Sequence, residues 1–233
     1  MKKLKRGKRM RSLLVALLLI CAIAAVGSAE MLVTANPIGQ GKWAVLGAGY
    51  QDSNAYNNSG WKTLTIGGYA GYGITNKLDV LAQIGQANVS GLPAGVSVSS
   101  LGYGLILKYA VLEEGASMPV SVSAGAGYKL LNNKVTGLAD ATGNQWLVGL
   151  GVSKMMVPFI PYGGVTYRNT NAGFAGGVLD SAQLDITLGT AIAWSTQGAV
   201  FVEYTLQSVN PSTASGIANH SSGQIGLGVG YKI

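Results

Sequence analysis

Residues 101–109, LGYGLILKY, and residues 78–84, LDVLAQI, decide the fold, because both alternate between apolar residues and other residues. In a β-strand, successive side chains point to opposite faces, whereas a helix places apolar residues at every third or fourth position. One face of the first segment is apolar and consists of Leu101, Tyr103, Leu105, Leu107 and Tyr109. Its other face carries two glycines, an isoleucine and Lys108. Both segments are therefore predicted to be β-strands with one apolar face.

These two strands also predict how they pair. When residues whose numbers sum to 187 are placed opposite one another, the midpoint of the hairpin falls inside its connecting loop. Leu78 then faces Tyr109, so apolar residues meet apolar residues, as cross-strand pairing requires. The same register sets Asp79 opposite Lys108 on the other face. The sequence therefore predicts an antiparallel hairpin with two opposite charges on its inner side.

The period of two continues along the chain and predicts ten strands. They lie near residues 42–50, 62–74, 78–88, 99–112, 119–130, 145–154, 159–169, 183–194, 199–208 and 223–233. Long polar loops are predicted at 51–61, 89–98, 131–144, 170–182 and 209–222, and short turns at 75–77, 113–118, 155–158 and 195–198. In segments 42–50 and 159–169 neither face is clearly apolar, so a count of eight strands is the alternative.

The first 29 residues are typical of a secretory signal peptide. Seven Lys and Arg residues precede an apolar run at 13–26 and the small residues Gly27, Ser28 and Ala29. This run of 14 residues is shorter than the roughly 20 that a membrane-spanning helix needs. The only cysteine, Cys21, lies inside the run and follows Ile20, which is too large for a lipoprotein processing site. We expect Sec-type export, cleavage after Ala29 and a mature chain without cysteine.

Cleavage of the signal peptide would remove the excess of basic residues. Of the sixteen Lys and Arg residues, seven lie in the signal segment, and the nine that remain equal the nine Asp and Glu residues. The mature chain is then formally neutral, so the sequence gives no support to a nucleic-acid partner.

The low content of charged residues indicates a surface that faces lipid. Charged residues make up 11% of the chain, against about 25% in a typical soluble domain. No apolar run long enough for a spanning helix follows the signal segment, and in hydrocarbon the other structure that satisfies its backbone hydrogen bonds is a closed barrel. Alternation alone is also compatible with an apolar face turned inward in a soluble fold. The low charge and the signal peptide favour an all-β, transmembrane, antiparallel up-and-down barrel at 42–233, after a periplasmic lead-in at 30–41 whose role is open.

Three stretches carry a resemblance to a known family. They are GYGITNKLDVLAQIG at 71–85, FVEYTLQS at 201–208 and QIGLGVGYKI at 224–233. These segments resemble small, porin-like outer-membrane β-barrel proteins of the Gram-negative type. The resemblance implies location in the outer membrane, contact with its lipid, and insertion by the barrel-assembly machinery. The assembly signal would consist of Ile225, Leu227, Val229, Tyr231 and Ile233, the last of which stands where the family usually has an aromatic residue.

Aromatic residues near strand ends are predicted to form girdles at the lipid headgroups. Alternation assigns Tyr72, Tyr109, Trp194 and Tyr231 to a lower outward set, and Tyr128 and Trp146 to an upper one.

The inner face leads to two function hypotheses. It is rich in Gly, Ser, Thr and Gln, and its charged members are Asp79, Lys108, Lys129, Asp185 and Glu203. In the first hypothesis these charges line a narrow passive pore for small solutes or ions; they can equally form internal pairs that close the lumen. The alternative is a non-conducting scaffold that presents loops for adhesion or supports envelope stability. The sequence does not predict an oligomeric state.

No catalytic, cofactor or metal site is predicted. The only histidine, His220, precedes Ser221 in the last loop, and Asp180 is the one acid that a neighbouring loop offers. The omptin proteases, which also use ten strands, carry paired aspartates and an Asp-x-His motif, and neither occurs here. With one histidine and no mature cysteine, a transition-metal site is not expected.

Overall fold

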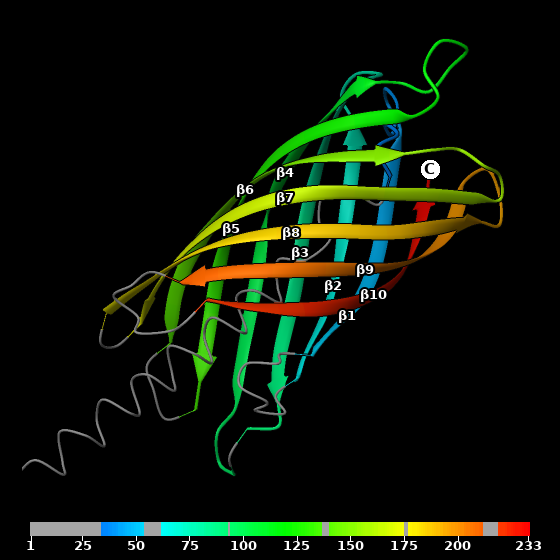
Figure 1. Cartoon of the computed structure of the whole chain (residues 1–233). Coiled ribbons are helices and arrows are strands. Elements are labelled where there is room, and N and C mark those ends of the chain that lie inside the picture. Colours follow the sequence, from blue (N-terminus) through cyan, green and yellow to red (C-terminus); the bar gives the residue numbers. More distant parts are fainter. Residues whose placement is uncertain (1–33, 54–61, 93, 137–139, 175–176, 212–218) are drawn as a thin grey trace, which may run out of the picture.

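The chain forms a closed antiparallel barrel (Figure 1). The computed structural model describes residues 34–53, 62–92, 94–136, 140–174, 177–211 and 219–233. Its ten strands are β1 (Trp43–Ser53), β2 (Lys62–Gly73), β3 (Leu78–Ser90), β4 (Val98–Leu112), β5 (Ser121–Val135), β6 (Ala141–Ser153), β7 (Phe159–Phe174), β8 (Gly177–Ala193), β9 (Gly198–Pro211) and β10 (His220–Lys232). Each strand pairs with the next, and β1 pairs with β10. The predicted up-and-down barrel of ten strands is confirmed, and the alternative of eight is wrong.

No helix in the described part of the chain is both long enough and apolar enough to cross a membrane.

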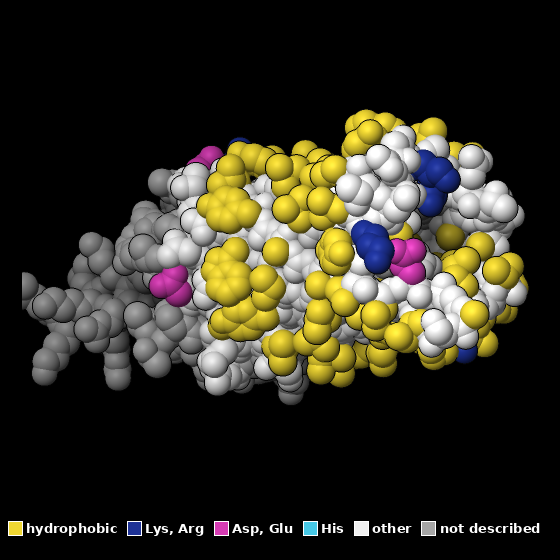
Figure 2. Space-filling model, turned by 90° about the horizontal axis from the view of Figure 1, so that it is seen from above, with side chains coloured by type: hydrophobic (Ala, Val, Ile, Leu, Met, Phe, Trp, Pro, Cys, Tyr) yellow, Lys and Arg dark blue, Asp and Glu magenta, His cyan; other side chains and the backbone are white. Residues whose placement is uncertain are grey.

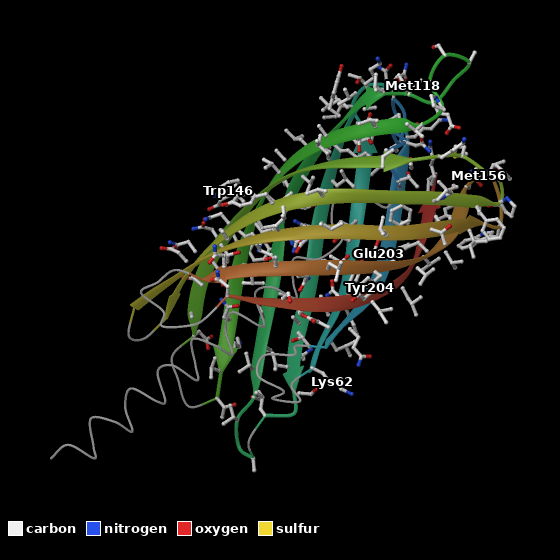
Figure 3. The ribbon with its side chains drawn as sticks, in the orientation of Figure 1. Lys62, Met118, Trp146, Met156, Glu203 and Tyr204 are labelled. Carbon is white, nitrogen blue, oxygen red and sulfur yellow. The ribbon has the colours of Figure 1, made fainter. Side chains whose placement is uncertain are left out.

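The two ends of the barrel differ in their connections. We call the end with the connections at 74–77, 113–120, 154–158 and 194–197 the lower end, and the opposite end the upper end. In the view of Figure 1, this lower end is drawn at the upper right. The carboxy-terminus, marked in Figure 1, lies at the lower end, where the backbone of Ile233 pairs with that of Trp43. Met118 and Met156 mark this end in Figure 3, while Lys62 and Trp146 lie toward the other.

Large apolar side chains face outward and polar ones face inward. Glu203 and Tyr204 are consecutive on β9 (Figure 3), yet their exposed fractions are 3% and 46%. Figure 2 shows hydrophobic side chains spread over the wall, with Lys, Arg, Asp and Glu side chains in a few scattered spots. Because an apolar surface of this extent is unfavourable in water, the outer wall requires an apolar environment.

The predicted register of the hairpin formed by β3 and β4 is confirmed. Leu78 lies opposite Tyr109, and Asp79 lies opposite Lys108, in the pairing of β3 with β4. The β4–β5 pairing contains one irregularity, between Ala110 and Leu112.

The two segments with no clear apolar face are complete strands. In β1, Tyr50 and Asp52 are buried on the inner side, and in β7 Tyr162 and Arg168 are buried there. Both faces of these strands thus carry large side chains, so the sequence shows no contrast in size or polarity between an inner and an outer face. Pro161 points outward on β7 and is exposed.

The predicted loops at 131–144 and 170–182 are wrong in extent. Strand β5 continues to Val135 and β6 begins at Ala141, while β7 continues to Phe174 and β8 begins at Gly177. At this height the outward residues are polar as well, so the hydrophobic alternation ends although the backbone pairing continues. The tips at 54–61, 137–139, 175–176 and 212–218, and the predicted signal peptide, lie outside the described residues.

Candidate functional site

The inner face of the barrel carries the polar chemistry of the molecule. Three levels follow one another from the lower to the upper end: a mouth crossed by an N-terminal segment, a layer of charged and aromatic side chains, and a layer of amides and hydroxyls.

At the lower mouth, Asp79 and Lys108 form the ion pair that their opposed positions allow, with 3.3 Å between Lys108 Nζ and Asp79 Oδ2. Both side chains are buried on the inner face. Removing one partner from a buried pair leaves an uncompensated charge, which costs about 3 to 5 kcal/mol.

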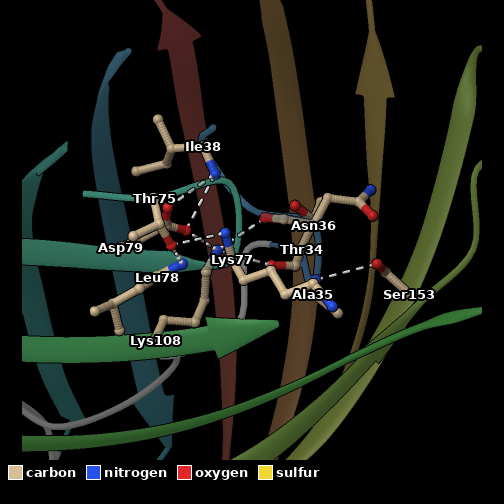
Figure 4. Close-up of polar contacts among 10 residues, drawn as sticks. All are labelled: Thr34, Ala35, Asn36, Ile38, Thr75, Lys77, Leu78, Asp79, Lys108 and Ser153. Carbon is tan, nitrogen blue, oxygen red and sulfur yellow. Dashed lines mark hydrogen bonds and ion pairs between the residues drawn. The ribbon is translucent and has the colours of Figure 1, made fainter. Parts of the chain in front are cut away.

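Residues 34–38 cross this mouth and bind the same ion pair; we call them the N-terminal strap. The backbone N–H of Ile38 donates to both carboxylate oxygens of Asp79, each at 3.1 Å. Lys108 Nζ donates to the carbonyl oxygens of Asn36, at 2.9 Å, and Thr34, at 3.4 Å (Figure 4).

The strap also contacts β5 and β6, the next strands along the wall from β4. The backbone N–H of Ala35 donates to Ser153 Oγ at 3.1 Å, and Ser121 Oγ donates to Asn36 Oδ1 at 2.6 Å. Ser121 and Ser153 lie at the lower ends of β5 and β6, so the strap joins this side of the mouth to β3 and β4. Residues 34–38 of the predicted lead-in, whose role the sequence left open, thus supply part of the inner surface.

The middle level is the central cluster, formed by Tyr50, Lys129, Tyr162, Arg168, Asp185 and Glu203. Arg168 Nη2 lies 2.6 Å from Asp185 Oδ2, and Gln183 Nε2 donates to Asp185 Oδ1 at 2.7 Å. Lys129, on β5, interacts electrostatically with both Arg168 and Asp185. Lys129, Arg168 and Asp185 are each 1% exposed. Protein atoms therefore enclose these three charged side chains.

Glu203 is held by an aromatic side chain. Tyr162 Oη donates to Glu203 Oε2 at 2.7 Å, and both side chains are buried. The tyrosine ring belongs to an apolar group that lies below the charges and consists of Ala48, Tyr50, Ile160, Tyr162, Ala191 and Phe201.

Glycines on the inner face provide the space for these rings. A Cβ atom at Gly226 would overlap the ring of Tyr50, and one at Gly228 would overlap the ring of Phe201. Part of the high glycine content therefore has a packing cause: large inward rings need neighbours without side chains.

The upper level is built from amides and hydroxyls. Gln145 Nε2 donates to Thr170 Oγ1 at 2.8 Å, and Ser222 Oγ donates to Gln207 Oε1 at 3.0 Å. Asp52, also inward, is completely buried. Filled positions thus continue above the central cluster.

All five inward charges predicted from the sequence lie on the inner face, but in different places. Asp79 and Lys108 belong to the lower mouth, whereas Lys129, Asp185 and Glu203 belong to the central cluster. The sequence reasoning missed Arg168, Asp52 and the strap.

The aromatic residues named from the sequence lie on the outer wall. Tyr109, Trp194 and Tyr231 are exposed near the lower end, and Tyr72, partly buried, packs on Trp43 with 4.9 Å between ring centres. Tyr128 and Trp146 lie opposite each other higher up. Trp43 and Tyr167, which the sequence reasoning missed, extend the two sets; Tyr167 lies 5.4 Å from Trp146. The residues of the predicted C-terminal assembly signal, Ile225, Leu227, Val229, Tyr231 and Ile233, are all exposed outward.

The residues considered for catalysis are not brought together in the described structure. Asp180 Oδ1 accepts a hydrogen bond of 2.6 Å from Asn171 Nδ2, and Ser221 is exposed. The side chain of His220 lies outside the described residues. Among the residues that are described, no three His, Cys, Asp or Glu side chains form a group suited to a metal ion.

No protein-family model and no curated protein match this chain. Solved structures with a similar fold include the translocator domain of autotransporter NalP from Neisseria meningitidis, with 10% identity, a TM-score of 0.49 and coverage of 97% of each chain. The β domain of the Bordetella autotransporter BrkA has 15% identity and a TM-score of 0.47, over 84% of this chain and all of that one. The outer membrane protease OmpT from Escherichia coli has 11% identity and a TM-score of 0.44, over 82% of this chain and 96% of that one.

Proposed function

We propose that this protein spans an outer membrane as a closed, non-conducting barrel and serves as a rigid scaffold of the envelope. The observation that carries the proposal is the burial of Lys129, Arg168 and Asp185, three charges from three strands that are each 1% exposed. A water-filled path through the barrel would leave inward charges accessible to water. The central cluster therefore favours the scaffold hypothesis over the passive pore.

The burial of these charges requires partners that are held in place. Removing an ion from water costs several kcal/mol, and an ion pair offsets this cost only when its geometry is good and further hydrogen bonds satisfy it. Asp185 has such partners, because it accepts from Gln183 while it pairs with Arg168. Arg168 meets this requirement only in part, because its Nε and Nη1 atoms are buried without a hydrogen-bond partner in the described structure.

The outer wall supports insertion into lipid. Apolar residues such as Leu105, Leu150 and Leu188 are more than half exposed at mid-height, and aromatic residues flank them toward the strand ends. An outward apolar band between two aromatic girdles is the usual surface of a transmembrane barrel. The predicted signal peptide adds a route out of the cytoplasm.

Planar-bilayer recording of the refolded mature chain tests the proposal. We expect no discrete conductance from the wild type, and channel openings from the triple variant Lys129→Ala, Arg168→Ala, Asp185→Ala, which removes the charged layer. The double variant Lys134→Ala, Asp140→Ala is the matched control, because these residues form an exposed pair outside the lumen, at 3.9 Å. Stable conductance of the wild type would contradict the proposal.

A further inference from the structure

A cavity of 620 Å³ lies between the N-terminal strap and the lower ends of the strands. Its volume is within the range of about 300 to 1,000 Å³ that is usual for small-molecule sites. Its inner part is apolar and is lined by Leu46, Tyr69, Leu81, Ile160, Ala191 and Phe201. The strap residues Pro37 and Ile38 form one of its walls.

The charged side chains that line this cavity are basic. Lys108 and Lys232 are its two charged lining residues among those described, and no carboxylate lines it there. Lys108 donates to Asp79 and to two carbonyl oxygens of the strap, so its charge is compensated. Within the described residues, the side chain of Lys232 makes neither a hydrogen bond nor an ion pair. Asp79 attracts and Lys42 repels its charge without contact, so the ammonium group is open to an anionic ligand.

The cavity reaches the rim of the barrel at the level of the lower aromatic girdle. Trp194 and Tyr231, which face outward there, also line it. Aromatic girdles lie at the lipid headgroups, so a molecule from the headgroup region can reach this opening. Gly198 lies at the rim of the cavity and Phe201 at its floor. Three residues of β9 separate them, which is about 10 Å along the strand.

From these features we infer that the cavity binds an amphiphile with a single apolar chain of medium length and a monoanionic head group. The chain lies among Leu46, Leu81 and Phe201, and the head group binds the ammonium group of Lys232. A floor about 10 Å from the rim fits a medium-length chain better than a long one. Both a free fatty acid and a single-chain anionic phospholipid have this chemistry.

Photo-crosslinking tests the site in the full mature chain, refolded into nanodiscs of neutral phosphatidylcholine. The probe is a twelve-carbon fatty acid with a diazirine at its methyl end, and mass spectrometry locates the modified residue. We expect modification of Leu46, Leu81 or Phe201. Excess dodecanoate should prevent it, whereas the uncharged methyl ester should not. Competition by a lysophosphatidylglycerol instead of dodecanoate would identify a lipid as the source of the same chemistry.

Two cavity variants and one control on the outer face separate binding in the cavity from contact with bulk lipid. Gly230→Leu places a side chain into the cavity from a position where a Cβ meets only ordinary contacts, the nearest being Leu46 at 3.5 Å. It should lower the crosslinking yield at least tenfold. The matched control is Gly47→Leu, since Gly47 is exposed on the outer face with no atom within 4 Å of a Cβ; its yield should not change. Lys232→Gln should raise the dodecanoate concentration for half-competition about tenfold.

Crosslinks confined to outward residues such as Leu227, or a yield that Gly230→Leu leaves unchanged, would overturn the inference. If circular dichroism shows that Gly230→Leu does not fold, Ala199→Leu fills the same cavity from β9 and takes its place. The inference does not depend on a closed lumen: a conducting wild type with crosslinks in the cavity would contradict the proposed function alone.

Discussion

The clearest stability prediction concerns the unequal cost of removing Arg168 or Asp185. In Arg168→Met, Asp185 still faces Lys129, so one opposite charge remains. In Asp185→Asn, Arg168 and Lys129 lose their shared anion, and two buried cations face each other. We expect the first variant to lower the free energy of unfolding by about 3 kcal/mol and the second by about 5 kcal/mol, the two ends of the range for a broken buried pair.

Urea titration in lipid vesicles, followed by tryptophan fluorescence, measures both values. The double variant Arg168→Met, Asp185→Asn completes a thermodynamic cycle and should show a coupling energy of about 1 to 3 kcal/mol. Loss of less than about 1 kcal/mol in Arg168→Met, or a smaller loss in Asp185→Asn than in Arg168→Met, would refute the reasoning.

Three further predictions concern other parts of the barrel. Asp79→Asn weakens the anchor of the strap, so hydrogen exchange at the Ile38 amide should accelerate about tenfold, the equivalent of about 1.4 kcal/mol; unchanged exchange would show that the strap is held by other contacts. Gly228→Ala places a methyl group against a buried phenylalanine ring and should cost about 1 to 3 kcal/mol in urea titration, while Gly47→Ala should stay within about 0.5 kcal/mol of the wild type. Leu105→Lys puts a charge into the lipid-facing band and should cost about 2 to 4 kcal/mol in vesicles; an unchanged stability would mean that this face meets water.

The sequence predicted the architecture where the two faces of a strand differ most. In β3 and β4, apolar residues occupy one face almost completely, so that both the strands and the opposition of Asp79 and Lys108 followed from spacing. In β7, Tyr162 and Arg168 point inward while Val165 and Tyr167 point outward, so size and polarity do not separate the faces. The burial of Arg168 therefore became visible only in the folded barrel.

The strap escaped prediction for a different reason. Its contacts with the barrel use the backbone N–H groups of Ala35 and Ile38 and the carbonyl oxygens of Thr34 and Asn36. Every residue except proline supplies both groups, so these contacts leave no mark in the choice of side chains; the described side-chain contact of the strap is the one in which Asn36 Oδ1 accepts from Ser121 Oγ. The barrel side gave an indication, because Asp79 and Lys108 pair near the strand ends and each can form further hydrogen bonds besides the ion pair.

The central cluster and the strap together decide from which side the lower cavity is reached. Above the cavity, the rings of Tyr162 and Phe201 and the charges of Arg168 and Asp185 are buried, so the closed lumen that we propose leaves a ligand no path to the upper end. On one side, the strap is fixed by the Asp79–Lys108 pair. In such a barrel, a ligand enters and leaves the cavity through the lower rim. Weakening the strap through Asp79→Asn should accelerate release of a bound amphiphile at the lower rim, because this change removes a wall of the cavity.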